Sequence, residues 1–302
     1  MATPKRPKRR APAPAARLPP IPCVLAIGGL DPGGGAGVLA DARAIARTGA
    51  FASAALAVLT VQSTSGMRSA TAVSRRELIA ECTEVVKHQR VRAIKVGALG
   101  SDENAGAIGD FLAIHRDLPA VVDTVMVPTR GRARLLDERA VSVLRDRVIG
   151  RAALVTVNGP EAEVLTGRRV TRLDEAHDAV LALLGLGVRA VLLKGGHLGG
   201  PRAVDVLGIA ASGEPRSGRD PRGAPQPRLI LLSASRLALP PFHGGGCILA
   251  SLIAGRLAMT EEAYRADPSA ALVAAVRWSK KLHHAALRRT RDVGGDLRVL
   301  VF

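Results

Sequence analysis

A run of three glycines ending in a cysteine, His243-Gly-Gly-Gly-Cys247, is the segment of this sequence best suited to chemistry. An apolar run, Ile248–Ala254, follows it and predicts a helix that begins at the glycines. Glycines leave their N–H groups unobstructed, and a helix N-terminus favours an anion such as a phosphate. The same field is expected to lower the pKa of Cys247 and favour its thiolate. The segment predicts phosphoryl transfer with Cys247 as base; the alternative is a glycine loop before a buried helix with an inert cysteine.

A second glycine-rich turn, Asp31-Pro-Gly-Gly-Gly-Ala-Gly37, follows a short apolar strand and opens a helix. It lacks the lysine of a P-loop and the downstream acidic residue of a dinucleotide fingerprint, so it matches neither motif. A tight strand-to-helix turn explains it equally well. Asp41, one turn into the helix, can likewise be an ordinary solvated residue.

Polar residues stand at the ends of three later strands. Lys194 ends an apolar strand before two glycines, which suits a phosphate contact. Asn158 and Glu161 follow another strand, although Asn158 can alternatively serve only as a helix N-cap. Asp123 closes a third strand, so Asp123 and Glu161 could share one Mg²⁺ through carboxylate oxygens or waters. Because ligands on parallel sheets bind beyond the carboxyl ends of the strands, this common placement favours a phosphoryl-transfer site.

Short apolar strands alternate with helices along most of the chain. Strands are predicted at 23–27, 52–59, 93–96, 120–123, 153–157 and 190–194, and helices at 38–46, 75–89, 103–116, 137–149, from about 161, 173–186 and 268–287. The alternation predicts an α/β fold with a central, mainly parallel sheet and helices on both faces. Beyond Gly199 the pattern breaks: 204–207 predicts an edge strand, and the Gly/Pro/Arg-rich segment 212–228 predicts a mobile loop.

Composition limits the remaining classes of function. The chain has 302 residues, 47% of them hydrophobic, which is enough for one large α/β domain or two modest ones. Three cysteines without disulfide or metal spacing favour a reducing, cytoplasmic setting. No apolar stretch reaches transmembrane length without charges or glycines, so no membrane association is expected.

The basic charge of the chain is concentrated partly in its first residues. The net charge is +17, but aromatic residues make up only 2%, so stacking on nucleic-acid bases has little support. Residues 1–22 mix lysine and arginine with proline and alanine and lack the apolar core of a secretory signal. They predict a disordered basic tail, and nucleic-acid binding through this tail is an alternative function.

The order and spacing of these motifs resemble the ribokinase-like superfamily, most closely the hydroxymethylpyrimidine/phosphomethylpyrimidine kinases of thiamine biosynthesis. The resemblance runs from about Cys23 to Ala258. It rests on Gly29-Leu-Asp-Pro-Gly-Gly-Gly-Ala-Gly37 with Ala40-Asp41, Leu59-Thr-Val-Gln62, Lys95-Val-Gly-Ala-Leu99, Val122-Asp-Thr-Val-Met126, Asn158-Gly-Pro-Glu161-Ala162, Lys194-Gly-Gly-His197 and His243-Gly-Gly-Gly-Cys247. It implies a three-layer ribokinase-like kinase domain over 23–290, followed by a C-terminal extension, 291–302.

The resemblance also implies an activity and a set of roles. The activity is ATP-dependent phosphorylation of 4-amino-5-hydroxymethyl-2-methylpyrimidine, its monophosphate, or both, with ATP and Mg²⁺ as cofactors. Cys247 stands where the family has its base. The pyrimidine pocket would be lined by Gly29, Asp41, Gln62 and Val125. Mg²⁺ would be held by Asp123 and Glu161, and the nucleotide phosphates would meet Asn158 and Lys194. The transferring phosphoryl group would meet the N–H groups of Gly244, Gly245 and Gly246. A small-molecule pyrimidine is the expected partner, and a homodimer is left open.

The sequence departs from the family pattern around this site. The family's Thr-His-Gly-Thr-Gly-Cys reads Phe242-His-Gly-Gly-Gly-Cys247 here, so two threonine hydroxyls are missing. Leu30 replaces a serine or threonine, and Ala98 replaces the methionine expected in the substrate pocket. Leu30, Phe242 and Gly245 leave open a non-catalytic, pyrimidine-binding regulatory protein. Ala98, which would enlarge the pocket, leaves open a kinase for another ring alcohol such as a pyridoxal-like substrate.

Overall fold

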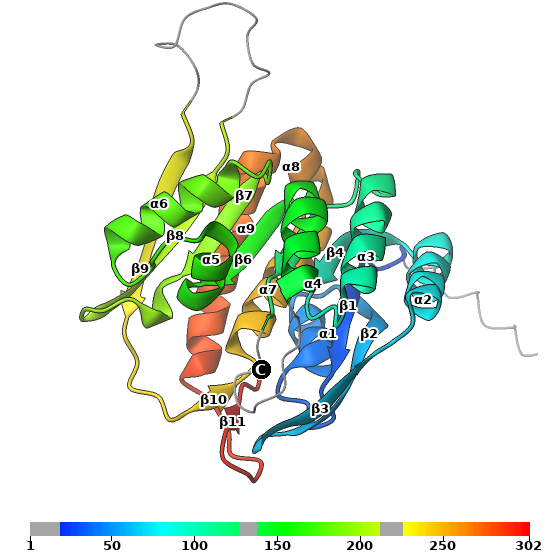
Figure 1. The fold of residues 1–302 in the computed structure, drawn as a ribbon, viewed down its shortest axis with the longest axis horizontal. Coiled ribbons are helices and arrows are strands. Elements are labelled where there is room, and N and C mark those ends of the chain that lie inside the picture. Colours follow the sequence, from blue (N-terminus) through cyan, green and yellow to red (C-terminus); the bar gives the residue numbers. More distant parts are fainter. Residues whose placement is uncertain (1–18, 127–137, 212–225) are drawn as a thin grey trace, which may run out of the picture.

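A nine-stranded sheet forms the middle layer of the protein, in the order β3-β2-β1-β4-β5-β6-β7-β8-β9 (Figure 1). The computed structural model describes residues 19–126, 138–211 and 226–302. The strands are β1 Cys23–Leu30, β2 Phe51–Ser63, β3 Gly66–Ala72, β4 Val91–Val96, β5 Ala120–Asp123, β6 Leu154–Asn158, β7 Ala190–Lys194, β8 Arg202–Ile209 and β9 Arg228–Ser235. From β2 through β7 neighbouring strands are parallel, and β3, β8 and β9 add antiparallel pairs at the two ends.

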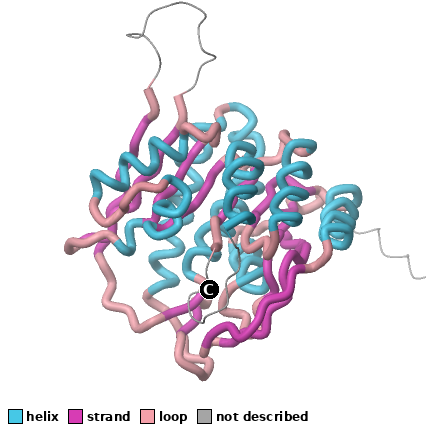
Figure 2. The backbone as a smooth tube through the Cα atoms, viewed as in Figure 1, coloured by secondary structure: helices cyan, strands magenta, loops and turns pink. Residues whose placement is uncertain are grey.

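Helices cover both faces of this sheet (Figure 2). One face carries α2 Arg75–His88, α3 Asp102–Ile114, α4 Glu138–Val143, α5 Gly159–Thr166 and α6 Leu173–Leu184, with a π-helical turn Leu144–Val148 and a 3-10 turn Ile149–Arg151 after α4. The other carries α1 Gly37–Arg47, α7 Gly245–Met259, α8 Glu261–Ala266 and α9 Pro268–Leu287. The α/β fold with a mainly parallel, doubly covered sheet is confirmed. No helix in the described part of the chain has both the length and the apolar character needed to cross a membrane.

Strand β1 explains why its sequence is apolar without alternation. Leu25 and Ile27 enter the core under α2 and α3, whereas Val24 and Ala26 enter the core under α7 and α9. Successive side chains of a strand point to opposite faces, so a strand covered on both faces must be apolar throughout.

The structure differs from the sequence expectations at both ends of the sheet. Strand β2 continues past Leu59 and turns back as β3, a hairpin that its small and polar residues did not reveal. The segment 204–207 was expected at an edge, but β8 pairs with both β7 and β9, and β9 is the edge strand. Most of the predicted tail, 1–22, and of the predicted loop, 212–228, lies outside the described residues; Arg228 itself begins β9.

The C-terminal residues lie beside the segment that precedes Gly244–Gly246. Two short strands, β10 Phe242–His243 and β11 Arg298–Val299, pair in parallel apart from the main sheet. The C-terminal extension predicted at 291–302 contains β11, and by pairing with β10 it supports the segment that leads into α7. The boundary between the domain 23–290 and the extension 291–302 stays a prediction.

The parallel strands bring their carboxyl ends to one edge of the sheet. β2 lies on one side of β1 and β4 on the other, so the direction of strand progression reverses between β1 and β4. A crevice forms at such a reversal, because the helices that follow the two strands cover opposite faces. This edge is where the site must be sought.

Asn104, at the start of α3, stabilises this part of the sheet through hydrogen bonds from its side chain. Its buried amide nitrogen donates to the carbonyl oxygens of Ala57, Val73 and Leu99, at 3.2, 3.0 and 3.1 Å. Replacing Asn104 by Ala leaves three buried acceptors without this donor, so we expect the free energy of unfolding to fall by about 2 kcal/mol. Urea unfolding followed by circular dichroism measures it. Glu103→Ala, on the exposed face of the same turn, is the control, with a loss below about 1 kcal/mol; equal losses for both variants would contradict the role given to the amide.

Candidate active site

A cavity of about 530 Å³ opens at the carboxyl ends of the parallel strands. Its volume lies in the range typical of small-molecule sites. All twelve site residues predicted from the sequence line it: Gly29, Asp41, Gln62, Asp123, Val125, Asn158, Glu161, Lys194, Gly244, Gly245, Gly246 and Cys247. The structure thus brings the predicted residues together, while their individual roles stay predictions.

The three glycines form the start of α7, as expected. Gly244 is the N-cap with a φ of 80°, in the left-handed region that side chains avoid. A Cβ atom there would also lie 1.9 Å from the carbonyl oxygen of Gly35, in the first glycine-rich turn. The N–H groups of the first turn of a helix have no intrahelical partner, and together with the dipole they suit a phosphate. The backbone of α7 can therefore act as an anion cradle without any side chain.

Phe242 accounts for the glycine at position 245, where the family pattern has threonine. A Cβ atom on Gly245 would lie 2.5 Å from Cε2 of the Phe242 ring. The phenyl ring thus occupies the space that a side chain at position 245 would need. The two departures from the family pattern are one coupled change, and the backbone cradle is kept.

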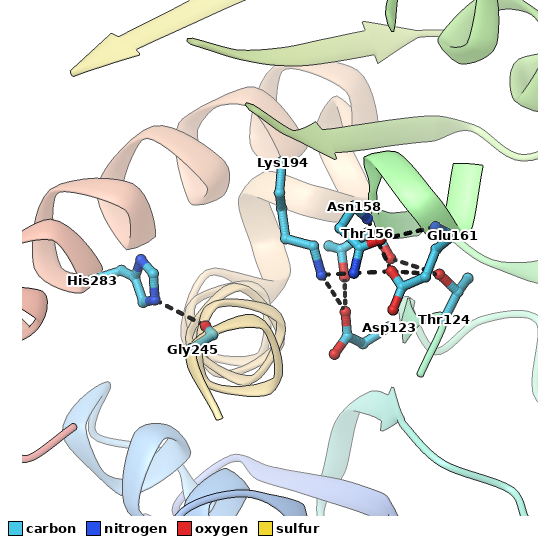
Figure 3. A network of polar contacts seen from close by, with 8 residues as sticks. All are labelled: Asp123, Thr124, Thr156, Asn158, Glu161, Lys194, Gly245 and His283. Atoms are coloured by element: carbon cyan, nitrogen blue, oxygen red, sulfur yellow. Dashed lines mark hydrogen bonds and ion pairs between the residues drawn. The ribbon is translucent and has the colours of Figure 1, made fainter. Parts of the chain in front are cut away.

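A network of charged and polar groups faces the cradle from β5, β6, α5 and β7 (Figure 3). Lys194 Nζ lies 2.9 Å from Asp123 Oδ1 and 4.0 Å from Glu161 Oε2. Thr156 donates its hydroxyl to Asp123 Oδ1 at 2.6 Å, and Thr124 donates to Glu161 Oε2 at 3.2 Å. The ammonium of Lys194 therefore stands between the two carboxylates that the sequence predicted as a pair.

The protonation states in this network follow from burial and neighbouring charge. Burial disfavours the ammonium of Lys194, but Asp123 and Glu161 outweigh it and raise its pKa. Burial likewise disfavours the Asp123 carboxylate, yet Lys194 and Lys95 hold its pKa below the usual range. Lys194 and Asp123 are consequently both charged at neutral pH.

Asn158 is an N-cap, one of the two roles the sequence allowed. Its side-chain oxygen accepts from the Glu161 N–H at 2.9 Å, and Glu161 Oε2 accepts from the Asn158 N–H at 2.9 Å. This capping box holds the Glu161 carboxylate at the cavity wall. Asn158 itself lines the cavity, so capping does not remove it from the site.

The donors at the cavity fit Mg²⁺ bound together with a phosphate. Asp123 and Glu161 offer carboxylate oxygens, the ligands this cation prefers, and Mg²⁺ commonly takes only one or two from protein. No group of three or more His, Cys, Asp or Glu side chains suited to a metal occurs among the described residues. A Cβ atom on Gly246 would stand 3.0 Å from Lys194 Nζ and 3.8 Å from Asp123 Oδ2, so only glycine leaves this space open.

The pKa expected for Cys247 is wrong. Burial raises the pKa of its thiol to about 12, and Asp123 and Asp41 add to the effect, whereas Lys95 and Lys194 oppose it. The partial positive charge at the start of α7 amounts to only about half a unit charge and does not offset the loss of hydration. The thiol is therefore protonated in the free protein at neutral pH.

An ion pair beneath the pocket was missed by the sequence analysis. Asp41 is fully buried, which excludes the alternative that it is an ordinary solvated residue. Its Oδ2 lies 2.7 Å from Lys95 Nζ, and its Oδ1 accepts a hydrogen bond from the Ser251 hydroxyl at 2.7 Å. Burial lowers the pKa of Lys95, but Asp41, Cys247 and Asp123 reverse the effect and raise it. A lysine inside an apolar strand could have been the signal, because a lysine is almost never fully buried without a partner.

A second missed contact joins the two glycine-rich turns. His243 Nε2 lies 3.0 Å from Asp31 Oδ2 and 2.7 Å from Gln62 Nε2. Asp31 also accepts from the N–H groups of Gly33 and Ala36, at 2.9 and 2.8 Å. Gln62, predicted to read the pyrimidine edge, therefore lies against His243, which Asp31 holds in place.

Comparison with known proteins identifies the family of this chain. The family model for phosphomethylpyrimidine kinase matches residues 31–297. The chain belongs to this family. It is 34% identical to the hydroxymethylpyrimidine/phosphomethylpyrimidine kinase of Rhizobium meliloti over 87% of this chain and 89% of that one. It is also 36% identical, over 95% of its own length, to a bifunctional thiamine biosynthesis protein of Geobacter sulfurreducens, but spans only 52% of that protein.

Solved structures show the same arrangement of the sheet and helices. The phosphomethylpyrimidine kinase of Clostridium difficile has a TM-score of 0.69 and 28% identity, covering 88% of this chain and 99% of its own. A pyridoxal kinase of Bacillus subtilis, solved as an ADP complex, has a TM-score of 0.76 at 22% identity, covering 93% of this chain and 97% of its own. The second likeness is one of fold, and it confirms the three-layer architecture expected from the resemblance.

The contact between Phe242 and Gly245 predicts a coupling between two substitutions. Gly245→Thr should lower the free energy of unfolding by about 1–3 kcal/mol, because its Cβ displaces the phenyl ring. In Phe242→Thr/Gly245→Thr the ring is gone, so the double variant should be more stable than the sum of the single losses by at least about 0.5 kcal/mol. Denaturant unfolding of the four proteins measures this coupling. Strictly additive losses would contradict the contact.

The raised pKa of Cys247 predicts how its alkylation depends on pH. With a pKa near 12, the thiolate fraction and the rate of reaction with iodoacetamide should rise about tenfold per pH unit from pH 7 to 9.5. A thiol with a lowered pKa would instead reach a plateau near pH 7. Peptide mapping by mass spectrometry follows the Cys247 adduct, with Cys247→Ser to identify its peptide and Cys82, whose pKa is also raised to about 12, as an internal comparison.

Proposed function

We propose that this chain transfers the γ-phosphoryl group of ATP to hydroxymethylpyrimidine, to its monophosphate, or to both. The observation that carries the proposal is the convergence of the α7 glycines, Lys194 and Cys247 on one cavity at the point where the strand order reverses. Membership of the phosphomethylpyrimidine kinase family supports it. The second activity of the longer bifunctional relative is not included in this proposal.

The phosphate end of the cavity lies between α7 and Lys194. The N–H groups of Gly245 and Gly246 would meet the phosphoryl oxygens, and the Lys194 ammonium would neutralise their charge from the opposite side. Asp123 and Glu161 would hold Mg²⁺, which supplies further neutralisation of the phosphates when bound. Asp123 also keeps Lys194 charged and in place through their 2.9 Å contact.

The pyrimidine end lies over β1, β2 and β4. Gly29 and Val125 provide flat and apolar walls, and Gln62 presents an amide that can pair with the aminopyrimidine edge. Asp41 is held by Lys95 and Ser251, so its carboxylate has one fixed orientation below the ring. Rigid side chains of this kind position the hydroxymethyl group without an ordering cost on binding.

Catalysis would come mainly from positioning and charge neutralisation, because phosphoryl transfer demands little covalent chemistry from the protein. Cys247 would take the proton that the substrate hydroxyl loses as its oxygen bonds to phosphorus. Since the thiol is protonated in the free protein, only the small thiolate fraction could accept it, and this contribution should grow with pH. A cytoplasmic setting belongs to the proposal, because the three cysteines are unpaired; a homodimer stays untested.

A phosphoryl-transfer assay with Mg·ATP and hydroxymethylpyrimidine tests the proposal. We expect turnover by the wild type and a loss of roughly a hundredfold in kcat for Cys247→Ala, the scale of losing one acid–base group. Cys82→Ala, a buried cysteine away from the cavity, is the matched control and should keep its rate. Unchanged turnover in Cys247→Ala would remove Cys247 from the mechanism.

Two alternatives are separated by the same assay. Ala98 lines the cavity and widens it, which favours a pyridoxal-like substrate as the second candidate. Pyridoxal phosphorylated with the higher kcat/KM would establish it. Binding of the pyrimidine, measured by calorimetry, with no turnover of either alcohol would instead favour the regulatory protein.

A further inference from the structure

His283 of α9 contacts the backbone of the cradle from behind. Its Nε2 lies 2.9 Å from the carbonyl oxygen of Gly245, the first residue of α7. Figure 3 shows the imidazole directed at this oxygen, on the side of α7 opposite to Lys194. The cradle is thus held between a histidine on one side and the charged network on the other.

The contact bears on the N–H group of Gly246 through the geometry of one peptide bond. The carbonyl of Gly245 and the N–H of Gly246 belong to the same planar, trans peptide, so they point in opposite directions. A group that holds the carbonyl toward α9 therefore directs the N–H away from α9. Lys194 and Asp123 lie next to Gly246, since a Cβ there would stand 3.0 Å from Lys194 Nζ and 3.8 Å from Asp123 Oδ2, and Figure 3 shows Lys194 on the side of α7 opposite to His283.

The Gly245–Gly246 peptide is the first within α7, where its carbonyl also accepts inside the helix, and the bond from His283 adds to that restraint. It joins two glycines, which have access to more backbone conformations than any other residues. The N-cap before them, Gly244, also lacks a side chain, so no capping oxygen fixes the first turn. Where the family pattern has a threonine at position 245, this chain has glycine beside the Phe242 ring. The bond from His283 restrains this peptide from outside the turn.

We propose that His283 is a positioning residue: its N–H holds the Gly245–Gly246 peptide in the orientation that presents the Gly246 N–H to the transferring phosphoryl group. The inference rests on the proposed phosphoryl transfer for its kinetic consequence. Its structural part, the orientation of one peptide, stands on the contact itself.

The protonation state of His283 suits this role. Burial lowers its pKa to about 4, and the positive charge of Lys280 adds to the effect. Lys194, across α7, and His284, next in α9, act in the same direction, whereas the Gly245 carbonyl opposes them. The imidazole is therefore neutral above pH 5, with its proton on Nε2 to donate to the carbonyl.

Three substitutions in α9 separate positioning from general stability. His283→Leu removes the donor but fills the space, and we expect kcat to fall roughly tenfold, less than the loss of an entire oxyanion donor, with KM for hydroxymethylpyrimidine unchanged. His283→Gln places an amide N–H at a reach similar to Nε2 and should recover kcat to within about threefold of the wild type. His284→Leu, the adjacent position in α9, should leave both constants unchanged. Equal kcat values for the Leu and Gln variants of His283 would overturn the proposal.

A second readout does not depend on turnover. In protein labelled with [¹⁵N]glycine, the amide resonance of Gly246 should shift in His283→Leu relative to the wild type and to His283→Gln, at equal global stability by urea unfolding, because its nitrogen shares a peptide with the carbonyl that His283 contacts. An unaltered Gly246 resonance would overturn the role of His283 even if the wild type is active. A wild type without turnover but with the expected shift pattern would refute the kinase activity and retain the anchoring of the peptide. If His283→Leu does not fold, His283→Met replaces it in both measurements.

Discussion

The burial of charge at the carboxyl edge of the sheet is the constraint on which the site depends. Two lysines, Lys95 and Lys194, end or nearly end central strands and are largely withdrawn from water. An unpaired buried charge is strongly destabilising, so each requires a carboxylate at contact distance, Asp41 for one and Asp123 for the other. Removing either partner of such a pair typically costs about 3–5 kcal/mol. The pairs therefore tie α1 and β5 to β4 and β7, and they fix the floor of the cavity before any ligand binds.

The same charges decide the chemistry of the cysteine. Cys247 stands at the start of a helix, a position that favours a thiolate, but it also faces two carboxylates in a poorly hydrated site. The full charges of Asp123 and Asp41 and the loss of hydration outweigh the partial charge of the helix end and the two lysines. A kinase site built this way relies on arranged N–H groups and ammonium charge, and its cysteine is not a ready base in the resting protein.

Close approach at three successive glycines is the second constraint. A Cβ at Gly244 would collide with the backbone carbonyl of Gly35, one at Gly245 would meet the Phe242 ring, and one at Gly246 would come within 3.0 Å of the Lys194 ammonium. These neighbours come from different parts of the chain. On the side of α9, His283 contacts the Gly245 carbonyl. A turn without side chains is thus given a defined shape by its surroundings.

Local patterns in the sequence were enough to predict most strands and helices, the parallel sheet and the polar residues at the strand ends, whereas Gly29, Asp41, Gln62 and Val125 were assigned to the site only by the family resemblance. Apolar runs, glycine turns and caps act over a few residues, and parallel strands place their ends at one edge by necessity. The order of the outer strands β8 and β9, the hairpin of β2 with β3, the Lys95–Asp41 pair and the pKa of Cys247 depend on contacts between distant segments. Those contacts arise only on folding, because burial and neighbouring charge act through space and leave no periodic signal along the chain.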